Sequence, residues 1–482
     1  MASSFAAHTH PLSWTSSMKL LSHSFAPPNR KSSLLSYRRN RMSNCLSLSA
    51  SVNSTVETNN ICSTLLELCE GHVPDHVLQR QAFFWAEEVG YIVPTPVQNE
   101  ALPVLFSGRD CVIHAQVNTI QIPVLLKCSG KTLAYLLLIF SVVNPQRSSV
   151  QAVIVVPTRE LGMQVTKVAR TLAAKSLQLE NEQKSCTVMA LLDGGTLRRH
   201  KSWLKVEPPV IVIATLRSLC QMLDKHILKL DALRVLVIDE VDFMFNSSKE
   251  VSSLKKLLTI HSSINSRQTV FASASIPQHR RFVYDCIQQK WTKANVVHVH
   301  VNPIEPMPLC LHHRYVICGN REKYSTLLQL LQSDSPLSAI IFVGEQSEKS
   351  KKAGNAPSTT LLIEFLRTSY GGCLELVLLE EDINFNQRAT SITDLKQSGD
   401  YLLVATDIAG RGVDLPETTH IYNFDIPKDA INYLHRAGRT GRKPFSDSKC
   451  YVTSIISAEE RFVLQRFENE LKFHCEELLF SE

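Results

Sequence analysis

Residues 235–242 read Val235-Leu236-Val237-Ile238-Asp239-Glu240-Val241-Asp242, and this segment says most about how the chain folds. Its first four residues form a short apolar run rich in β-branched side chains, which is typical of a parallel strand buried on both faces. Two adjacent carboxylates end the run, and an unpaired charge is costly in an apolar core. At the carboxyl end of a strand in an open α/β sheet, these acids would instead face the crevice in which such sheets bind ligands.

The two acids Asp239 and Glu240 have two interpretations. Acids at the end of a strand often do no more than cap the following helix. Alternatively, one carboxylate holds Mg²⁺ through water, and its neighbour positions a water molecule for attack on a phosphate. The second interpretation requires a phosphate-binding segment elsewhere in the chain.

A candidate phosphate-binding segment comes earlier in the chain. Residues 110–114 predict a short strand, and Ser129, Gly130, Lys131 and Thr132 then open a predicted helix. Gly-Lys-Thr after a strand is the second half of a phosphate-binding loop, in which backbone donors and the lysine hold phosphates and the threonine holds Mg²⁺. The pattern therefore favours the catalytic interpretation of the two acids.

Short apolar strands alternate with helical segments in two successive sets. In the first set, further strands are predicted at residues 152–156, 187–192, 210–214, 235–238 and 269–272. In the second set, strands are predicted at residues 339–342, 374–379, 402–405, 420–423 and 449–454. This alternation predicts an α/β protein with two tandem, doubly wound parallel sheets. We expect the first domain at residues 57–300, a proline-containing linker at 301–312, and the second domain, with a short terminal helix, at 313–482.

Two segments of the second domain carry further chemistry. Residues 406–414 directly follow a predicted buried strand. Residues 435–442 read His435-Arg436-Ala437-Gly438-Arg439-Thr440-Gly441-Arg442, with three arginines and two glycines. Arginine recognises phosphate with paired, charge-matched hydrogen bonds, and glycine lets the backbone approach closely. A merely solvated basic face would not need the glycines, so this segment predicts phosphate recognition.

The first 56 residues differ in composition from the rest of the chain. They contain no Asp or Glu, many serines and six basic residues, the first of which is Lys19. This composition predicts an organelle transit peptide at residues 1–56. Because no Lys or Arg precedes Lys19, a basic amphipathic helix of mitochondrial type is not expected at the start, and we expect a chloroplast address. The alternatives are a mitochondrial address and a Ser-rich tail that targets nothing.

Composition places limits on the rest of the protein. At 482 residues the chain has room for two or three domains, and no apolar run approaches the roughly 20 residues that a membrane helix needs, so we expect no membrane partner. The 13 cysteines include no Cys-x-x-Cys pair, which predicts a reducing compartment and neither a disulfide framework nor a zinc site. Without residues 1–56, Lys and Arg fall from 51 to 45 and equal the 45 acids. Nucleic-acid binding must therefore depend on local sites.

Together these segments resemble the DEAD-box RNA helicases of superfamily 2. Nine motifs follow one another in the family's order from about Gly90 to Arg442, and residues 435–442 match the family pattern His-Arg-x-Gly-Arg-x-Gly-Arg. The resemblance implies two RecA-like domains that close over ATP and Mg²⁺ on one side and an RNA strand on the other. It also implies an RNA-stimulated ATPase that parts short duplexes locally, contacts RNA without reading its sequence and acts as a monomer, with a protein partner supplying specificity.

The resemblance assigns roles to particular positions. Catalysis would use the metal-site acids, a linking histidine and two arginine fingers: Asp239, Glu240, His435, Arg439 and Arg442. Nucleotide binding would use Thr95, Gln98, Ser129, Gly130, Lys131, Thr132 and Asp414, with Thr132 and Asp239 at the metal. RNA contacts would come from Pro157, Thr158, Arg159, Gly194, Gly195, Thr215, Arg388, Thr406 and Gly410. Ser273 and Ser275 would couple hydrolysis to domain closure.

The phosphate loop departs from the family pattern. Family members read Ala-x-Thr-Gly-Ser-Gly-Lys-Thr, whereas residues 117–128 stand here in place of the Thr-Gly pair. The insert has no glycine and one charge, Lys127, and it puts Leu125 at the usual position of the first glycine. We interpret it as a splice or gene-model product, because the codon of Val117 begins with GT and the codons of Cys128 and Ser129 can span an AG. A second function class therefore stays open, a non-catalytic RNA-binding protein of the same fold, and binding of a fluorescent ATP analogue separates the two.

A second departure concerns an RNA contact. After Thr215, the family's Pro-Gly-Arg is replaced by Leu216, Arg217 and Ser218. The tetrad Asp-Glu-Ala-Asp appears with Val241 in place of alanine, which keeps all three acids. The catalytic acids are therefore expected to act as in the family, while one RNA-contacting turn differs.

Overall fold

The structure is a computed structural model that describes residues 93–115, 130–175, 186–192, 197–246, 248–276, 281–301, 307, 310–372, 374–380, 383, 385–410, 413, 415–416, 418–441 and 449–479. The expected transit peptide at residues 1–56 and the insert at 117–128 lie outside the described residues. All described elements belong to one compact unit, residues 60–482.

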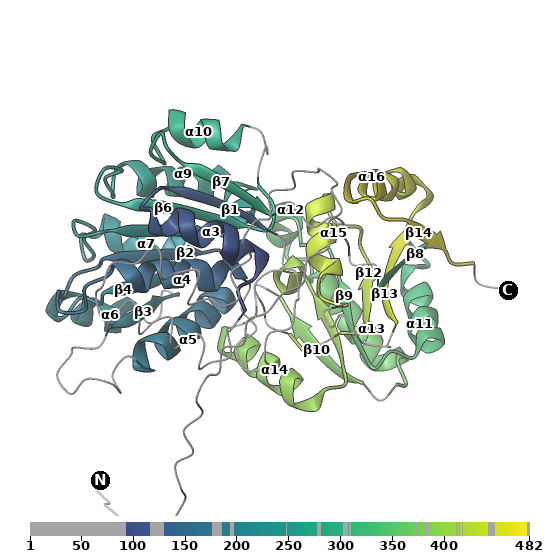
Figure 1. Ribbon diagram of the computed structural model, residues 1–482. Coiled ribbons are helices and arrows are strands. Elements are labelled where there is room, and N and C mark those ends of the chain that lie inside the picture. The colour runs from purple at the N-terminus through teal and green to yellow at the C-terminus, as the bar shows by residue number, and fades with distance from the viewer. Residues whose placement is uncertain are drawn as a thin grey trace, which may run out of the picture. The chain divides into compact units, whose positions relative to one another are not determined.

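The first sheet consists of seven parallel strands in the order β3-β4-β2-β5-β6-β1-β7 (Figure 1). Their bounds are Cys111–Ala115 for β1, Ala152–Val156 for β2, Val188–Leu191 for β3, Ile211–Thr215 for β4, Val235–Asp239 for β5, Gln268–Ser273 for β6 and Val297–Val301 for β7. Strand β5 lies in the middle, with Val237 paired to Ile154 of β2 and to Val270 of β6. The apolar run at residues 235–238 is therefore a buried parallel strand, as predicted.

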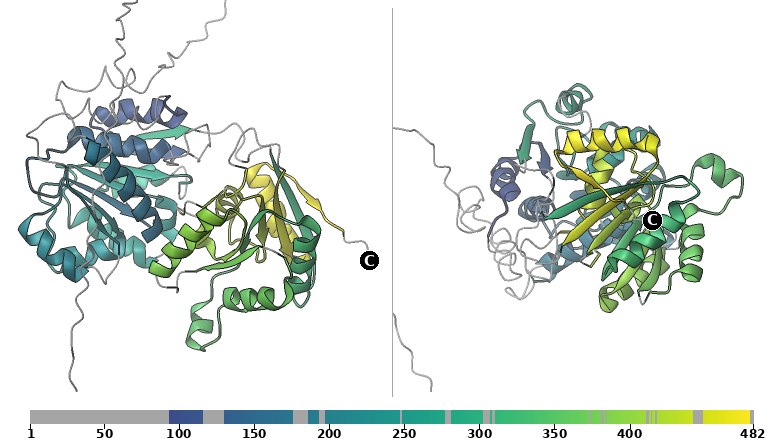
Figure 2. Two further views of the ribbon diagram at one scale, coloured as in Figure 1. Left: turned by 90° about the horizontal axis from the view of Figure 1, so that it is seen from below. Right: turned by 90° about the vertical axis from the view of Figure 1, so that its right-hand side faces the viewer.

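Helices cover both faces of this sheet (Figures 1 and 2). They are α3 (Pro96–Phe106), α4 (Gly130–Val142), α5 (Arg159–Lys175), α6 (Leu197–Val206), α7 (Leu216–Asp224), α8 (Val241–Asn246), α9 (Ser248–Thr259) and α10 (Phe282–Gln288). Successive strand residues point to opposite faces. Ile154 and Val237 accordingly pack in the core with helix α4, whereas Val155 and Ile238 pack in the core with helices α7 and α9.

The second sheet repeats this architecture. Its parallel strands lie in the order β10-β11-β9-β12-β13-β8-β14, which is the order of the first sheet with each strand number raised by seven. The bounds are Leu311–Ile317 for β8, Ser338–Phe342 for β9, Glu375–Leu379 for β10, Tyr401–Ala405 for β11, His420–Asn423 for β12, Cys450–Ile456 for β13 and Cys475–Glu477 for β14. Its helices are α11 (Lys323–Asp334), α12 (Glu348–Lys352), α13 (Ser358–Ser369), α14 (Phe385–Ser398), α15 (Ala430–Ala437) and α16 (Arg461–Leu471), with short 3₁₀ helices η1 (Asp407–Gly410) and η2 (Ala458–Glu460). Two tandem doubly wound parallel sheets are thus confirmed.

Strands β7, β8 and β14 were absent from the sequence prediction. Strand β7 reads Val-His-Val-His-Val, and polar residues also interrupt β8, so neither has the continuous apolar run of a central strand. The predicted linker at 301–312 overlaps both strands, because Val301 ends β7 and Leu311 begins β8. Strand β14 has three residues and follows the predicted terminal helix, α16.

Within the described ranges, no helix has the length and apolar character needed to cross a membrane.

Candidate nucleotide-binding and catalytic site

Asp239 ends strand β5 and is buried there among polar partners. The Tyr135 hydroxyl on α4 donates a hydrogen bond of 2.7 Å to its Oδ2, and the Glu240 backbone N–H donates one of 3.0 Å to its Oδ1. Burial raises the pKa of Asp239 to about 7, and the neighbouring Glu240 charge adds to the increase, while the Tyr135 hydrogen bond and the Lys131 charge oppose it. A buried carboxylate in this state is suited to holding a cation.

Glu240 has an unusual backbone conformation between strand and helix. Its φ is +48°, a left-handed value that non-glycine residues seldom adopt and that often marks functional sites. The residue stands between the end of β5 and the start of α8 at Val241. Its Oε2 is buried and has no hydrogen-bond partner among the described residues. A carboxylate oxygen held in this way can accept a hydrogen bond from a water molecule.

Asp242, the third acid of this segment, contacts residues of two other motifs. It accepts hydrogen bonds from Ser273 at 2.6 Å and from Ser275 at 2.9 Å, and its Oδ2 lies 3.5 Å from His435 Nε2. One ligand atom from each of Glu240, Asp242 and His435 lies within 4.8 Å of the others, the only such trio in the part of the chain that the structure describes. The predicted coupling serines and linking histidine thus meet at Asp242.

The second half of the phosphate loop lies at the start of α4. Lys131 and Thr132 are buried, and the Lys131 amino group donates a hydrogen bond of 2.7 Å to the Ala115 carbonyl at the end of β1. This bond connects the two ends of the chain segment that contains the insert. Ser129, also predicted to bind nucleotide, lies outside the described residues.

Thr95 and Gln98 contact the same helix end. Gln98 accepts a hydrogen bond from the Thr95 backbone N–H at 2.8 Å and donates one to the Gly130 carbonyl at 3.2 Å. A Cβ at Gly130 would collide with the Thr95 hydroxyl, so a glycine is needed for this close approach. The predicted nucleotide-binding residues Thr95 and Gln98 therefore lie against the start of helix α4.

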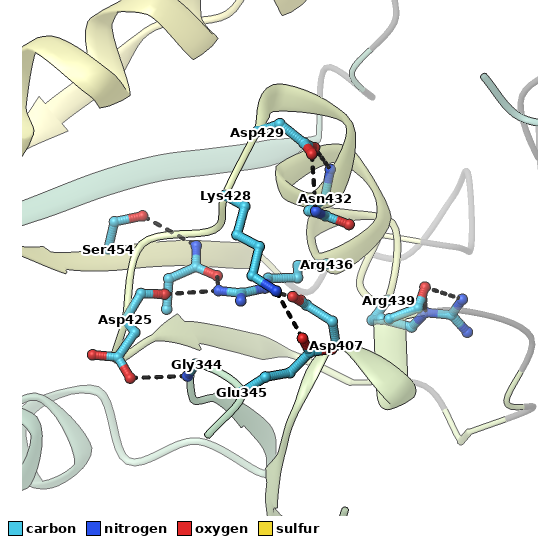
Figure 3. A network of polar contacts seen from close by, with 12 residues as sticks. Gly344, Glu345, Asp407, Asp425, Lys428, Asp429, Asn432, Arg436, Arg439 and Ser454 are labelled. Carbon is cyan, nitrogen blue, oxygen red and sulfur yellow. Dashed lines mark hydrogen bonds and ion pairs between the residues drawn. The ribbon is translucent and has the colours of Figure 1, made fainter. Parts of the chain in front are cut away.

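Arg439 is held by the segment that follows β11. Its guanidinium donates to the Gly410 carbonyl at 2.6 and 3.1 Å and to the Val413 carbonyl at 2.7 Å (Figure 3). One predicted arginine finger is thereby fixed against residues 406–414. The other finger, Arg442, and the predicted ribose ligand, Asp414, lie outside the described residues.

Arg436 belongs to the arginine-rich segment predicted to recognise phosphate, but the structure shows its guanidinium bound to protein groups instead (Figure 3). It is fully buried and donates to Asp407 Oδ1 at 2.6 Å, to Asn423 Oδ1 at 3.1 Å and to the Asp425 carbonyl at 2.8 Å. Its guanidinium also lies 5.0 Å from the centre of the Phe342 ring. Arg436 therefore connects β9, η1, β12 and α15, and it is buried on α15 together with Tyr433 and Ala437.

Several predicted RNA contacts lie at strand ends. Thr158 follows β2, and Thr215 ends the neighbouring strand β4, where its hydroxyl lies 3.0 Å from that of Ser218 in the altered turn. Thr406 and Gly410 follow β11, and Pro157 and Arg159 flank Thr158. Gly194 and Gly195 lie outside the described residues.

Arg388 has a protein partner in this structure. Its guanidinium lies 2.8 Å from the Glu160 carboxylate and donates to the Glu380 carbonyl at 3.2 Å. Both charged side chains of the pair are buried. RNA binding by Arg388 stays a prediction, since this charge is already paired with Glu160.

Comparison with known proteins identifies the family. Residues 95–282 match the family described as DEAD/DEAH box helicase, and residues 322–444 match the one described as Helicase conserved C-terminal domain. The chain belongs to the DEAD-box RNA helicases. It is 65% identical over 435 residues to the DEAD-box ATP-dependent RNA helicase 58, chloroplastic, of Arabidopsis thaliana, an alignment that covers 89% of this chain and 88% of the relative. The protein of the same name from Oryza sativa subsp. japonica is 65% identical over 416 residues and covers 86% of this chain and 89% of its own.

Solved structures support the fold. Mss116p bound to single-stranded RNA and AMP-PNP has a TM-score of 0.70 at 23% identity, covering 89% of this chain and 82% of its own. Dbp5 of S. cerevisiae bound to RNA and ADP BeF3 has a TM-score of 0.67 at 20% identity, and the match covers 86% of this chain and 96% of the Dbp5 chain. The two sheets are the tandem RecA-like domains of DEAD-box helicases.

Proposed function

We propose that this chain is an ATP-dependent RNA helicase that remodels RNA by closing its two RecA-like domains over ATP and a single RNA strand. The observation that carries this proposal is the end of β5, where three acids have three different environments. Asp239 is buried beside Lys131, Glu240 presents an oxygen with no partner among the described residues, and Asp242 binds Ser273 and Ser275. These environments suit three different tasks: Asp239 would hold the metal ion, Glu240 would position the attacking water, and Asp242 would couple hydrolysis to domain closure.

The residues at the end of β5 fit Mg²⁺, which would neutralise phosphate charge when bound with ATP. Asp239 and Thr132 would hold it, since a carboxylate and a hydroxyl are ligands that Mg²⁺ prefers. The raised pKa of Asp239 supports this fit, because a buried carboxylate gains from a nearby cation. Lys131 would contact the phosphates, and Glu240 would orient the attacking water.

RNA would lie along the strand ends that carry Thr158, Thr215, Thr406 and Gly410. Contacts to the sugar–phosphate backbone hold RNA without reading its sequence. We propose a monomer that works in the chloroplast stroma, in line with the two relatives that are named chloroplastic, and a protein partner that selects the RNA.

A non-catalytic RNA-binding protein is the second candidate, and the insert at residues 117–128 favours it. A phosphate loop needs converging backbone N–H groups, and glycines allow the required dihedral angles. Twelve residues without a glycine replace the Thr-Gly pair on one side of the loop. In this candidate the protein would bind RNA while its nucleotide site stays unused.

The variant Glu240→Gln tests the catalytic proposal. It removes the charge that orients water but leaves Asp239 and Lys131 in place. RNA-stimulated ATP hydrolysis should disappear, whereas ATP-dependent RNA binding, measured by fluorescence anisotropy, should persist. Equal turnover in variant and parent would refute the role of Glu240. A parent that neither binds a fluorescent ATP analogue nor hydrolyses ATP would establish the non-catalytic candidate instead.

A further inference from the structure

Helix α6 carries an exposed aromatic side chain on a segment with only basic charges. Its ten residues, Leu197–Val206, include four Lys or Arg residues, one histidine and no acid. Trp203 is 59% exposed and Val206 is 86% exposed. A single exposed apolar residue is ordinary on a protein surface. An exposed tryptophan on a wholly basic helix is a different case, because aromatic rings and cations together form the usual surface for single-stranded nucleic acid.

The helix is anchored to the domain, so the exposure of Trp203 follows from its place on the helix. Leu204 is 5% exposed and belongs to the same core cluster as Met189 and Leu191 of β3. Successive residues of a helix are about 100° apart around its axis. With Leu204 facing the core, Trp203 is directed to the side and Val206 outward. Lys201 and Lys205 are both exposed on the flank opposite Trp203.

The strand that precedes α6 ends beside one of the strand ends to which RNA binding is proposed. Strand β3 ends at Leu191, and the carbonyl of the next residue, Leu192, accepts a hydrogen bond of 3.4 Å from the Thr215 hydroxyl. The chain enters α6 five residues later. Given a rise of 1.5 Å per residue, Trp203 lies about 9 Å along the axis from Leu197. That distance is on the order of one or two nucleotide steps.

We infer that α6 is an accessory binding site for single-stranded RNA that crosses the outward face of the helix, where Trp203 on one flank stacks on a base and Lys205 on the other flank contacts a phosphate. The site would receive nucleotides that extend beyond the strand ends carrying Thr158 and Thr215. Stacking on an aromatic face is sequence-tolerant because every base has such a face. The inference rests on the proposed RNA binding of the domain and adds a length dependence to it.

Affinity measured against RNA length tests the inference. Fluorescently labelled oligouridylates of increasing length would be titrated by anisotropy against the full chain and against Trp203→Ala. For the shortest oligonucleotides that bind, variant and parent should have equal affinity. For longer ones the variant should bind about tenfold more weakly, which is the size of one base–aromatic stack. Trp203→Phe should recover most of the loss, since a phenyl ring also stacks.

Matched controls separate stacking from a general loss of apolar surface. Phe462→Ala removes another side chain that is 69% exposed, on α16 of the second domain, and should leave every affinity unchanged. Lys205→Gln should reduce the salt dependence of long-oligonucleotide binding by about 0.7 in the log–log slope, the value for one phosphate contact with a single strand. Lys255→Gln, an exposed lysine on α9, should not.

The outcomes are distinct. If parent and Trp203→Ala bind long and short oligonucleotides equally well, the accessory site is refuted while RNA binding by the domain stands. If Phe462→Ala weakens binding as much as Trp203→Ala does, stacking at α6 is also refuted. A parent that binds no oligonucleotide of any length would refute both the proposed function and the accessory site.

Discussion

At the scale of single residues, the surroundings of Asp239 at the end of β5 make its carboxylate suited to binding a cation. Asp239 is buried, yet it accepts two hydrogen bonds and lies beside the positive charge of Lys131. Burial still dominates and raises its pKa to about 7. Without a bound cation, the ionised carboxylate therefore lowers the free energy of unfolding at neutral pH. A bound cation would offset this loss.

Because of the raised pKa of Asp239, we predict that the effect of Asp239→Asn on stability depends on pH. Because the folded pKa lies above the ordinary value of 3.8, the stability contribution of Asp239 is full below about pH 4 and is lost as pH rises towards 7. Asparagine cannot ionise and lacks this loss. Thermal denaturation without nucleotide or metal should show the variant gaining in Tm relative to the parent between pH 5 and 7. Above pH 7 the difference should level off, and a difference constant across this range would contradict the assignment.

At the scale of elements, Arg436 connects segments that lie far apart in the sequence. Its guanidinium binds Asp407 of η1, Asn423 of β12 and the Asp425 carbonyl, all from within α15 (Figure 3). The neighbouring Arg439 is held by the Gly410 carbonyl. Arg436 thus fixes the end of α15, three residues before Arg439.

We predict that breaking the contacts of Arg436 greatly lowers the free energy of unfolding. Arg436→Gln leaves Asp407 without its partner, and removing one member of a buried ion pair costs about 3–5 kcal/mol. Urea unfolding should show this loss, with Asp407→Asn costing less because the Arg436 guanidinium keeps its hydrogen bonds to Asn423 and to the Asp425 carbonyl. The double variant should cost clearly less than the sum of the two single changes. Additive losses would show that the two side chains do not act as a pair.

The insert at residues 117–128 predicts weak or absent ATP binding by this chain. Replacing it with Thr-Gly restores the spacing of a phosphate loop between Ala115 and Gly130, whose neighbour Lys131 already binds the Ala115 carbonyl. RNA-stimulated ATPase activity should appear in the replaced version. Side-by-side ATP titration checks this, and equal affinity of both versions would show that the insert is tolerated.

The sequence predicted some strands of the two sheets and missed others. Continuous apolar runs identified the central strands, including β5, because burial on both faces leaves no room for polar residues. The same rule missed β7 and β8, where alternating polar residues mark strands that are not fully enclosed. The contacts of Arg436 were missed because its partner Asp407 is 29 residues away, and no pattern of spacing specifies that contact.

At the scale of the whole molecule, charge is divided between a basic start and a neutral remainder. Residues 1–56 hold six basic residues and no acid, while the rest of the chain carries 45 of each sign. The two relatives that share 65% of the sequence are both named chloroplastic. The predicted targeting role would account for the basic start, and RNA binding would then depend on local sites such as those proposed at the strand ends and on α6.

A fusion of residues 1–60 to a fluorescent protein should enter plastids. The expectation follows from the acid-free, Ser-rich composition and from the late first basic residue, Lys19. Confocal imaging in leaf cells with plastid and mitochondrial markers checks it. As a control, residues 61–482 fused alone should stay in the cytosol, and import into mitochondria only would contradict the chloroplast address.

The repeated strand order means that each position in one sheet has a counterpart in the other. Strand β5 corresponds to β12, so Asp239 at the end of the first has Asn423 at the end of the second. Asp239 offers a negative charge that an outside cation can neutralise, whereas Asn423 is neutral and binds the guanidinium of Arg436. On the proposed function, one copy of the fold would take up its positive charge from solution in each turnover, whereas the other copy carries it permanently in the side chain of Arg436.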